Sequence, residues 1–158
     1  MNRVWKSGMN SNLKRRLFVT TVESVLLYGC EARALTVKDE KALDGVYTRM
    51  LRAALNVSWE ENMRNTEQYG YLPRLSDTIR QRRMRLAGHC VRHPELTASE
   101  MILWEPTHGK KSRGRPHATF IDTLKRDTGL NSTAEIKTLM MDRDEWRAAI
   151  RSSRVGWT

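Results

Sequence analysis

Helical periodicity is the feature that most limits how this sequence can fold. After Thr36, apolar residues return every three or four positions, which places them on one face of a helix. That face carries Leu43, Val46, Tyr47, Met50 and Ala54, and the other carries Lys38, Lys41, Arg49 and Arg52. No stretch alternates apolar and polar residues for long enough to predict a strand. The sequence therefore predicts an all-α fold, mainly helical, with about six helices and a basic linker loop.

Polar residues and glycines mark where these helices begin and end. Serine or threonine at a helix N-terminus accepts a hydrogen bond from a free backbone N–H, and we expect Thr36, Ser76, Thr97 and Ser132 to do so. A first helix is expected over 12–28, buried on every side in its apolar second half and stopped by Gly29. A later helix over 119–128 is closed by Gly129. Gly45 should cost its helix about 1 kcal/mol relative to alanine.

The stretch 106–118 differs in composition from the helical segments around it. It contains glycine, proline and four cationic side chains but no acidic residue. Such a stretch is typical of a linker. We therefore expect three parts: a helical region over 1–105, a basic linker over 106–118 and a small helical region over 119–158.

An excess of positive charge points to a polyanionic partner. The chain has 28 Lys and Arg against 18 Asp and Glu, a net charge of +10. Nucleic acid, as RNA or DNA, is the commonest such partner, and a membrane surface is the alternative. No apolar run can span a bilayer, and the N-terminus lacks the apolar segment of a secretory signal. We expect an intracellular protein, nuclear or cytoplasmic and not secreted, whose Cys30 and Cys90 are buried thiols.

One expected helix, over 76–93, concentrates this charge. No acidic residue lies between Thr78 and Pro94, and four basic side chains share one arc of the helix. They are Arg82, Arg85, His89 and Arg92. Arginines at these spacings can contact successive phosphates, whereas the alternative is an ordinary solvated helix face. The opposite arc carries Ile79, Leu86 and Cys90, which is not the aromatic and leucine face of a membrane-surface helix.

A second basic cluster lies in the expected linker. Its residues Arg113-Gly114-Arg115-Pro116 resemble an AT-hook, in which arginines enter a narrow minor groove. We favour the simpler interpretation of a cationic linker that contacts phosphates without reading sequence. The predicted nucleic-acid-binding residues of the two clusters are Arg82, Arg85, Arg92, Lys110, Lys111, Arg113 and Arg115.

Signals for catalysis and for metal binding are weak. His89 and His93 share a helix face, but Cys90 points about 100° away from His89, so no zinc site is expected. No Tyr-x-Asp-Asp turn, Walker loop or nucleophile elbow is present, so we expect no catalytic residue, cofactor or small-molecule substrate. The late acids Asp142, Asp144 and Glu145 stand beside Arg143 and Arg147, as surface ion pairs would. The five tryptophans are expected mostly as core anchors.

The order of motifs along the chain resembles a known family. The motifs include Leu26–Glu31, Leu35-Thr36, Val57-Ser58-Trp59, Ile79–Arg83, Arg85–His89, Leu103-Trp104, Arg113–Pro116, Leu124–Asp127 and Asp142–Trp146. Together they resemble the region downstream of the palm in non-LTR (LINE-type) retrotransposon polyproteins, which join an endonuclease to a reverse transcriptase. The resemblance covers about 13–146 and rests on order and spacing, not on any single motif.

This resemblance implies a helical thumb that begins near the first helix, in a parent enzyme that is an RNA-directed DNA polymerase. The family's catalytic aspartates are expected before Met1, so none is carried over and the chain is not expected to be an enzyme by itself. The expected function is binding of template RNA or target DNA. The chain departs from the family at Ala32-Arg33, Ala87, His117 and Phe120. These departures support the alternative, a transposon-derived relic with no selected activity.

Overall fold

The structure is a computed structural model and describes residues 2–105 and 119–153. The described residues form helices and connecting turns without a strand, which confirms the all-α class. The longer helices are α2 (Ser11–Phe18), α4 (Val37–Leu55), α6 (Leu75–Arg92), α8 (Phe120–Thr128), α9 (Thr133–Met141) and α10 (Arg143–Ser152). The shorter ones are α1 (Asn2–Trp5), α3 (Ser24–Leu26), α5 (Asn65–Tyr69) and α7 (Thr97–Ile102), with single 3-10 turns at Cys30–Ala32 and Trp59–Glu61.

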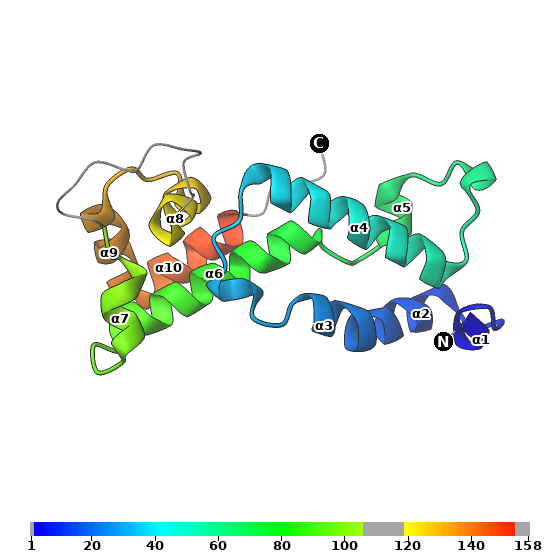
Figure 1. The fold of residues 1–158 in the computed structure, drawn as a ribbon, viewed down its shortest axis with the longest axis horizontal. Helices are drawn as coiled ribbons and strands as arrows, with labels where there is room; N and C mark the ends of the chain where they lie inside the picture. Colours follow the sequence, from blue (N-terminus) through cyan, green and yellow to red (C-terminus); the bar gives the residue numbers. More distant parts are fainter. Residues whose placement is uncertain (1, 106–118, 154–158) are drawn as a thin grey trace, which may run out of the picture.

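Helix α6 runs through the middle of an elongated molecule (Figure 1). Its first half packs with α4, on which α2 also lies, and its second half packs with α7, α9 and α10. Two apolar cores result. The first includes Phe18, Leu27, Tyr47, Leu51, Tyr69, Leu75 and Ile79, and the second includes Met84, Ala87, Cys90, Leu124, Ile136, Met140 and Trp146. Helix α6 therefore contributes side chains to both cores.

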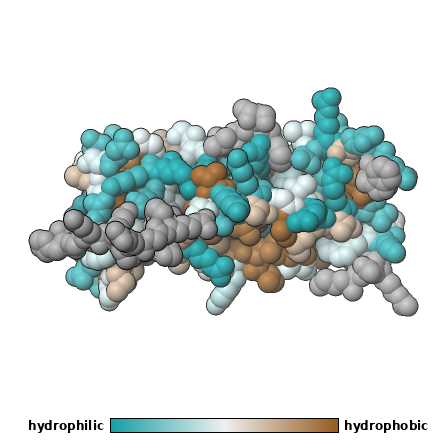
Figure 2. Space-filling model, turned by 45° about the horizontal axis from the view of Figure 1, so that its top comes forward, coloured by the Kyte–Doolittle hydropathy of each residue, from teal (hydrophilic) through white to brown (hydrophobic). Residues whose placement is uncertain are grey.

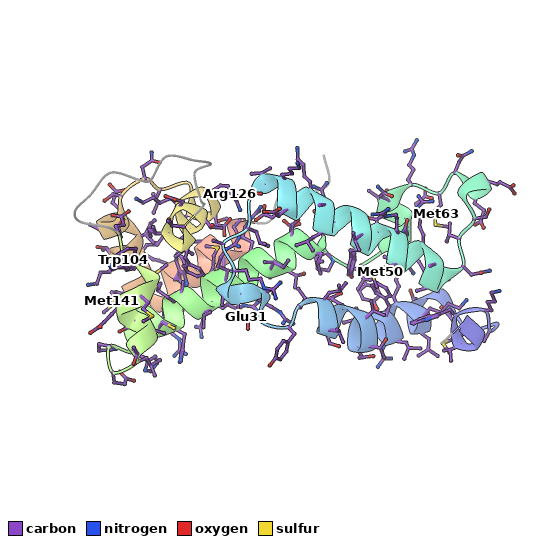
Figure 3. All side chains as sticks on the ribbon, viewed as in Figure 1. Glu31, Met50, Met63, Trp104, Arg126 and Met141 are labelled. Carbon is purple, nitrogen blue, oxygen red and sulfur yellow. The ribbon has the colours of Figure 1, made fainter. Side chains whose placement is uncertain are left out.

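A buried cluster of charges lies where the two cores meet on α6. The side chain of Arg83 is fully buried, and its Nε donates to Oδ2 of Asp127 in α8 over 2.8 Å. Its Nη2 lies 2.7 Å from the same oxygen and 3.3 Å from Oε1 of Glu40 in α4. Arg126 donates to that Glu40 oxygen and to the carbonyl of Leu35, and Figure 3 shows it where α8 meets the start of α4. The cluster thereby joins three helices that are far apart in sequence.

Pairing makes this burial of charge tolerable. Isolated charges are costly to take out of water, and a buried pair persists only where partners satisfy each group. Burial raises the pKa of Glu40 above its usual value, although Arg126 and Arg83 oppose that shift. Arg80 adds a third cation, with its Nε 3.3 Å from Oδ1 of Asp127 but without hydrogen-bond geometry.

The segment expected as one continuous helix over 12–28 is divided. Residues Val19–Glu23 form a π-helical turn between α2 and α3. The hydroxyl groups of Thr20, Thr21 and Ser24 donate to carbonyls three or four residues earlier, for example Thr21 Oγ1 to Leu17 over 2.7 Å. Such back-bonding competes with the regular ladder and bends helices. The expectation of burial on every side is also wrong, because Val25 and Tyr28 are 73% and 85% exposed.

Helix boundaries agree with the sequence where the cap is local. Thr36 and Asp39 form the expected capping box, Ser132 caps α9, and Gly29 and Gly129 adopt positive φ at helix ends. Two caps were predicted wrongly. Thr97 lies inside α7, whose cap position makes no side-chain hydrogen bond. Ser76 lies inside α6, and its backbone N–H donates to Asp44 of α4 over 2.9 Å. A carboxylate from another helix thus replaces the local cap.

Residues 119–153 share a core with the second half of α6. Ile121, Leu124 and Ile136 pack in the same cluster as Met84 and Cys90. The described elements thus form two cores that meet within α6. The division of the chain at 106–118 stays a prediction, because the expected linker lies outside the described residues.

Replacement of Asp127 by asparagine should destabilise the fold strongly. Asp127→Asn leaves the fully buried Arg83 without its nearest carboxylate, and breaking a buried pair costs about 3–5 kcal/mol. Urea unfolding followed by circular dichroism measures the loss. The control is Asp144→Asn, which removes a carboxylate whose side chain is 89% exposed and should change the free energy of unfolding by about 1 kcal/mol or less. Equal effects of the two substitutions would contradict the structural role of the cluster.

Candidate nucleic-acid interface

Close packing of α10 on α6 begins with a glycine and a tryptophan. The indole ring of Trp146 is buried over Gly88, and its Nε1 donates to the carbonyl of Met84 over 2.9 Å. A Cβ atom at position 88 would lie 2.3 Å from Nε1 of Trp146, closer than real contacts allow. Glycine at this position therefore lets α10 approach α6.

This approach brings two rows of basic side chains to one cleft. Helix α6 contributes Arg85, His89 and Arg92, and α10 contributes Arg143, Arg147 and Arg151. Trp146 and Ile150 complete the lining of a cleft of about 460 Å³. We call this feature the arginine cleft and define it by the six basic residues. No carboxylate is among the eight side chains that line it.

Charges in the arginine cleft are poorly neutralised. Within the described ranges, Arg85, Arg143 and Arg151 have no carboxylate within ion-pair distance. Arg147 pairs with Asp144 over 3.1 Å, and both side chains are exposed. Arg92 donates to the carbonyl of Met140 over 2.6 Å. Its pKa is lowered by burial and by the positive charges of Arg143 and Arg147. The arrangement favours an anion that would relieve this repulsion.

The basic arc predicted on α6 therefore supplies only part of the lining of the cleft. Arg85 and Arg92 line the cleft, whereas Arg82 is exposed but lies outside it, near Cys30. The linker residues Lys110, Lys111, Arg113 and Arg115 lie outside the described residues, so their role stays a prediction.

Sequence reasoning missed the arginines of α10. Asp142 caps that helix by accepting from the backbone N–H groups of Asp144 and Glu145, and of the expected ion pairs with Arg143 and Arg147 only Arg147–Asp144 forms. The sequence feature that could have indicated these arginines is their regular spacing. Arg143, Arg147 and Arg151 follow one another at intervals of four residues, on the face that holds Trp146 and Ile150.

The potential metal ligands and most aromatic residues singled out in the sequence do not gather into a second site in the described ranges. In the described ranges no three His, Cys, Asp or Glu side chains could share a metal ion. The rings of His89 and His93 lie 4.4 Å apart, and His93 contacts Glu95. Trp146 is the core anchor that was expected, but Trp104 is 64% exposed at the end of the molecule near α7 (Figure 3).

Comparisons with known proteins do not identify the chain. No protein-family model matches it, and no curated protein or solved structure matches it significantly. Of the helices that the structure describes, none has the length and apolar character needed to cross a membrane. In the view of Figure 2, hydrophilic side chains cover much of the surface around a central apolar area.

Alanine should have opposite effects at two helical glycines. Gly88→Ala forces a methyl group against the pinned ring of Trp146, and overpacking of this kind costs about 1–3 kcal/mol. Gly45→Ala in α4 meets no atom within 4 Å, so the better helix propensity of alanine should stabilise the protein by about 1 kcal/mol. Thermal unfolding of both variants checks the signs. A stabilised Gly88→Ala protein would show that α10 does not pack as described.

The two thiols should resist modification in the folded state. Cys30 and Cys90 are free and buried, as the sequence predicted. Burial, assisted by a hydrogen bond to Glu31, raises the pKa of Cys30 to about 11, and burial also raises that of Cys90. Little thiolate forms near neutral pH, so an aromatic disulfide reagent should label both thiols slowly in buffer and rapidly in denaturant. Fast labelling in buffer would contradict the burial.

Proposed function

We propose that this chain binds nucleic acid through the arginine cleft, without performing chemistry on it. The observation that carries the proposal is the convergence of Arg85, Arg143 and Arg151, none of them paired with a carboxylate in the described chain, on one cleft. Phosphate oxygens satisfy guanidinium groups with charge-assisted hydrogen bonds and release counterions on binding. A polyanion therefore suits this cleft better than a neutral ligand does.

The resemblance to LINE-type retrotransposon proteins suggests the context in which nucleic acid is bound. On that basis the chain acts as the thumb and post-palm part of a reverse transcriptase, and it grips template RNA or target DNA in the nucleus or cytoplasm. Arg82 and the linker cations Lys110, Lys111, Arg113 and Arg115 would extend the contact beyond the cleft. Polymerisation would belong to the palm of the parent enzyme.

The second candidate is a transposon-derived relic with no selected activity. The departures at Ala87 and Phe120, where the family often has tryptophan, favour it. A relic would still attract polyanions through its net charge of +10. The two candidates differ in where binding occurs, because attraction by net charge alone does not depend on one particular cleft.

Binding should depend on the position of three arginines and not only on their charge. The variant Arg143→Ala/Arg147→Ala/Arg151→Ala removes the α10 row, and the control Lys38→Ala/Lys41→Ala/Arg49→Ala removes the same charge from exposed positions of α4. Fluorescence anisotropy with labelled duplex DNA over a salt series measures affinity. We expect the α10 variant to lower the slope of log K against log salt by about one per arginine, and the control to change it little.

Equal losses in the two variants would favour the relic. An affinity that does not change with ionic strength would contradict the proposal altogether. A third variant, Lys110→Ala/Lys111→Ala/Arg113→Ala/Arg115→Ala, measures the share of the linker in the same assay. Circular dichroism of each variant checks that the helices are retained.

A further inference from the structure

The arginines of α10 form a regularly spaced row within the cleft. Arg143, Arg147 and Arg151 are separated by four residues each, which corresponds to about 6 Å along the helix axis. This interval is comparable with the separation of successive phosphates along one nucleic-acid strand. Facing them, Arg85 and Arg92 supply guanidinium groups from α6. The spacing of the α10 arginines therefore matches the spacing of phosphates along one strand.

The tryptophan of the cleft is poorly placed to stack on bases. Trp146 is 2% exposed, and its only polar hydrogen is already donated to Met84. His89 is exposed, and the centroid of its ring lies 4.4 Å from that of His93, which packs beside it. Proteins that hold unpaired bases generally use accessible aromatic faces for stacking. The lining instead offers guanidinium groups, which donate hydrogen bonds and cannot accept them.

We propose that the arginine cleft recognises the sugar–phosphate backbone of a single strand and leaves the bases outside. One arginine of α10 contacts each of three consecutive phosphates, and Arg85 and Arg92 contact them from the other wall. The ligand is thus the backbone itself, whether its bases are paired, unpaired or missing. This inference rests on the proposed function and specifies which part of the nucleic acid the cleft contacts.

Asp144 adds a competitor for the middle position of the row. Its carboxylate pairs with Arg147 over 3.1 Å while remaining 89% exposed. A phosphate that binds Arg147 must displace this carboxylate or share the guanidinium with it. Removal of Asp144 therefore frees Arg147 and lowers the negative charge at the edge of the cleft. Asp144→Asn should increase affinity for any strand that carries phosphates.

The experiment compares an oligothymidine with an abasic strand of equal length, both bound to the full chain. Fluorescence anisotropy at low salt gives the two dissociation constants. We expect them to agree within about threefold, because phosphate contacts carry no information about bases. Asp144→Asn should tighten binding of both strands by the same factor. The α10 triple variant should lower the salt slope for each strand by about 2, from roughly 0.7 per phosphate contact.

The outcomes separate this inference from the proposed function. If the oligothymidine binds but the abasic strand binds more than about tenfold more weakly, bases contribute and the inference is overturned. An Asp144→Asn effect on one strand only would overturn it as well. If neither strand nor duplex DNA binds, the proposed function fails instead. The α4 control variant should bind both strands like the parent chain.

Discussion

A guanidinium group in the interior of the molecule holds the remaining elements in place. Arg83 can be buried only because Asp127 and Glu40 meet it from two other helices. Apolar contacts alone would allow α4 and α8 to slide along α6, since such contacts have little directionality. Hydrogen bonds to a planar guanidinium are directional, so they fix the positions of both helices. The register of the helices thus depends on this cluster.

The arginine cleft is a consequence of that register. Helix α8 carries Asp127 and leads into α9 and α10, and α10 then lies against α6 because Gly88 leaves room for Trp146. The resulting repulsion among arginines is offset by burial of Trp146 and Ile150 in the second core. One face of α10 therefore buries Trp146 and Ile150 and, along its edge, carries the arginines of the cleft.

The sequence predicted features that depend on neighbouring residues better than features that depend on tertiary contacts. The capping box of Thr36 and the stop at Gly129 depend on neighbours within a few residues, and both were found. Arg83 sits in a basic run, so nothing in the local sequence distinguishes it from the exposed Arg82 and Arg85. Its burial depends on carboxylates more than 40 residues away. For the same reason the basic arc of α6 was predicted without the arginines of α10 that face it.

The sharing of α6 between two cores has a consequence for how the protein comes apart. A molecule with two separate cores can melt in two steps, each region opening on its own. Here the same continuous helix supplies Ile79 to one core and Met84 to the other, with Arg83 tied between them. Local unfolding that starts at either end of the molecule must stop near Arg83, or it disrupts both cores. We therefore expect the two ends of the molecule to unfold as one cooperative unit, with the slowest amide exchange in the middle of α6.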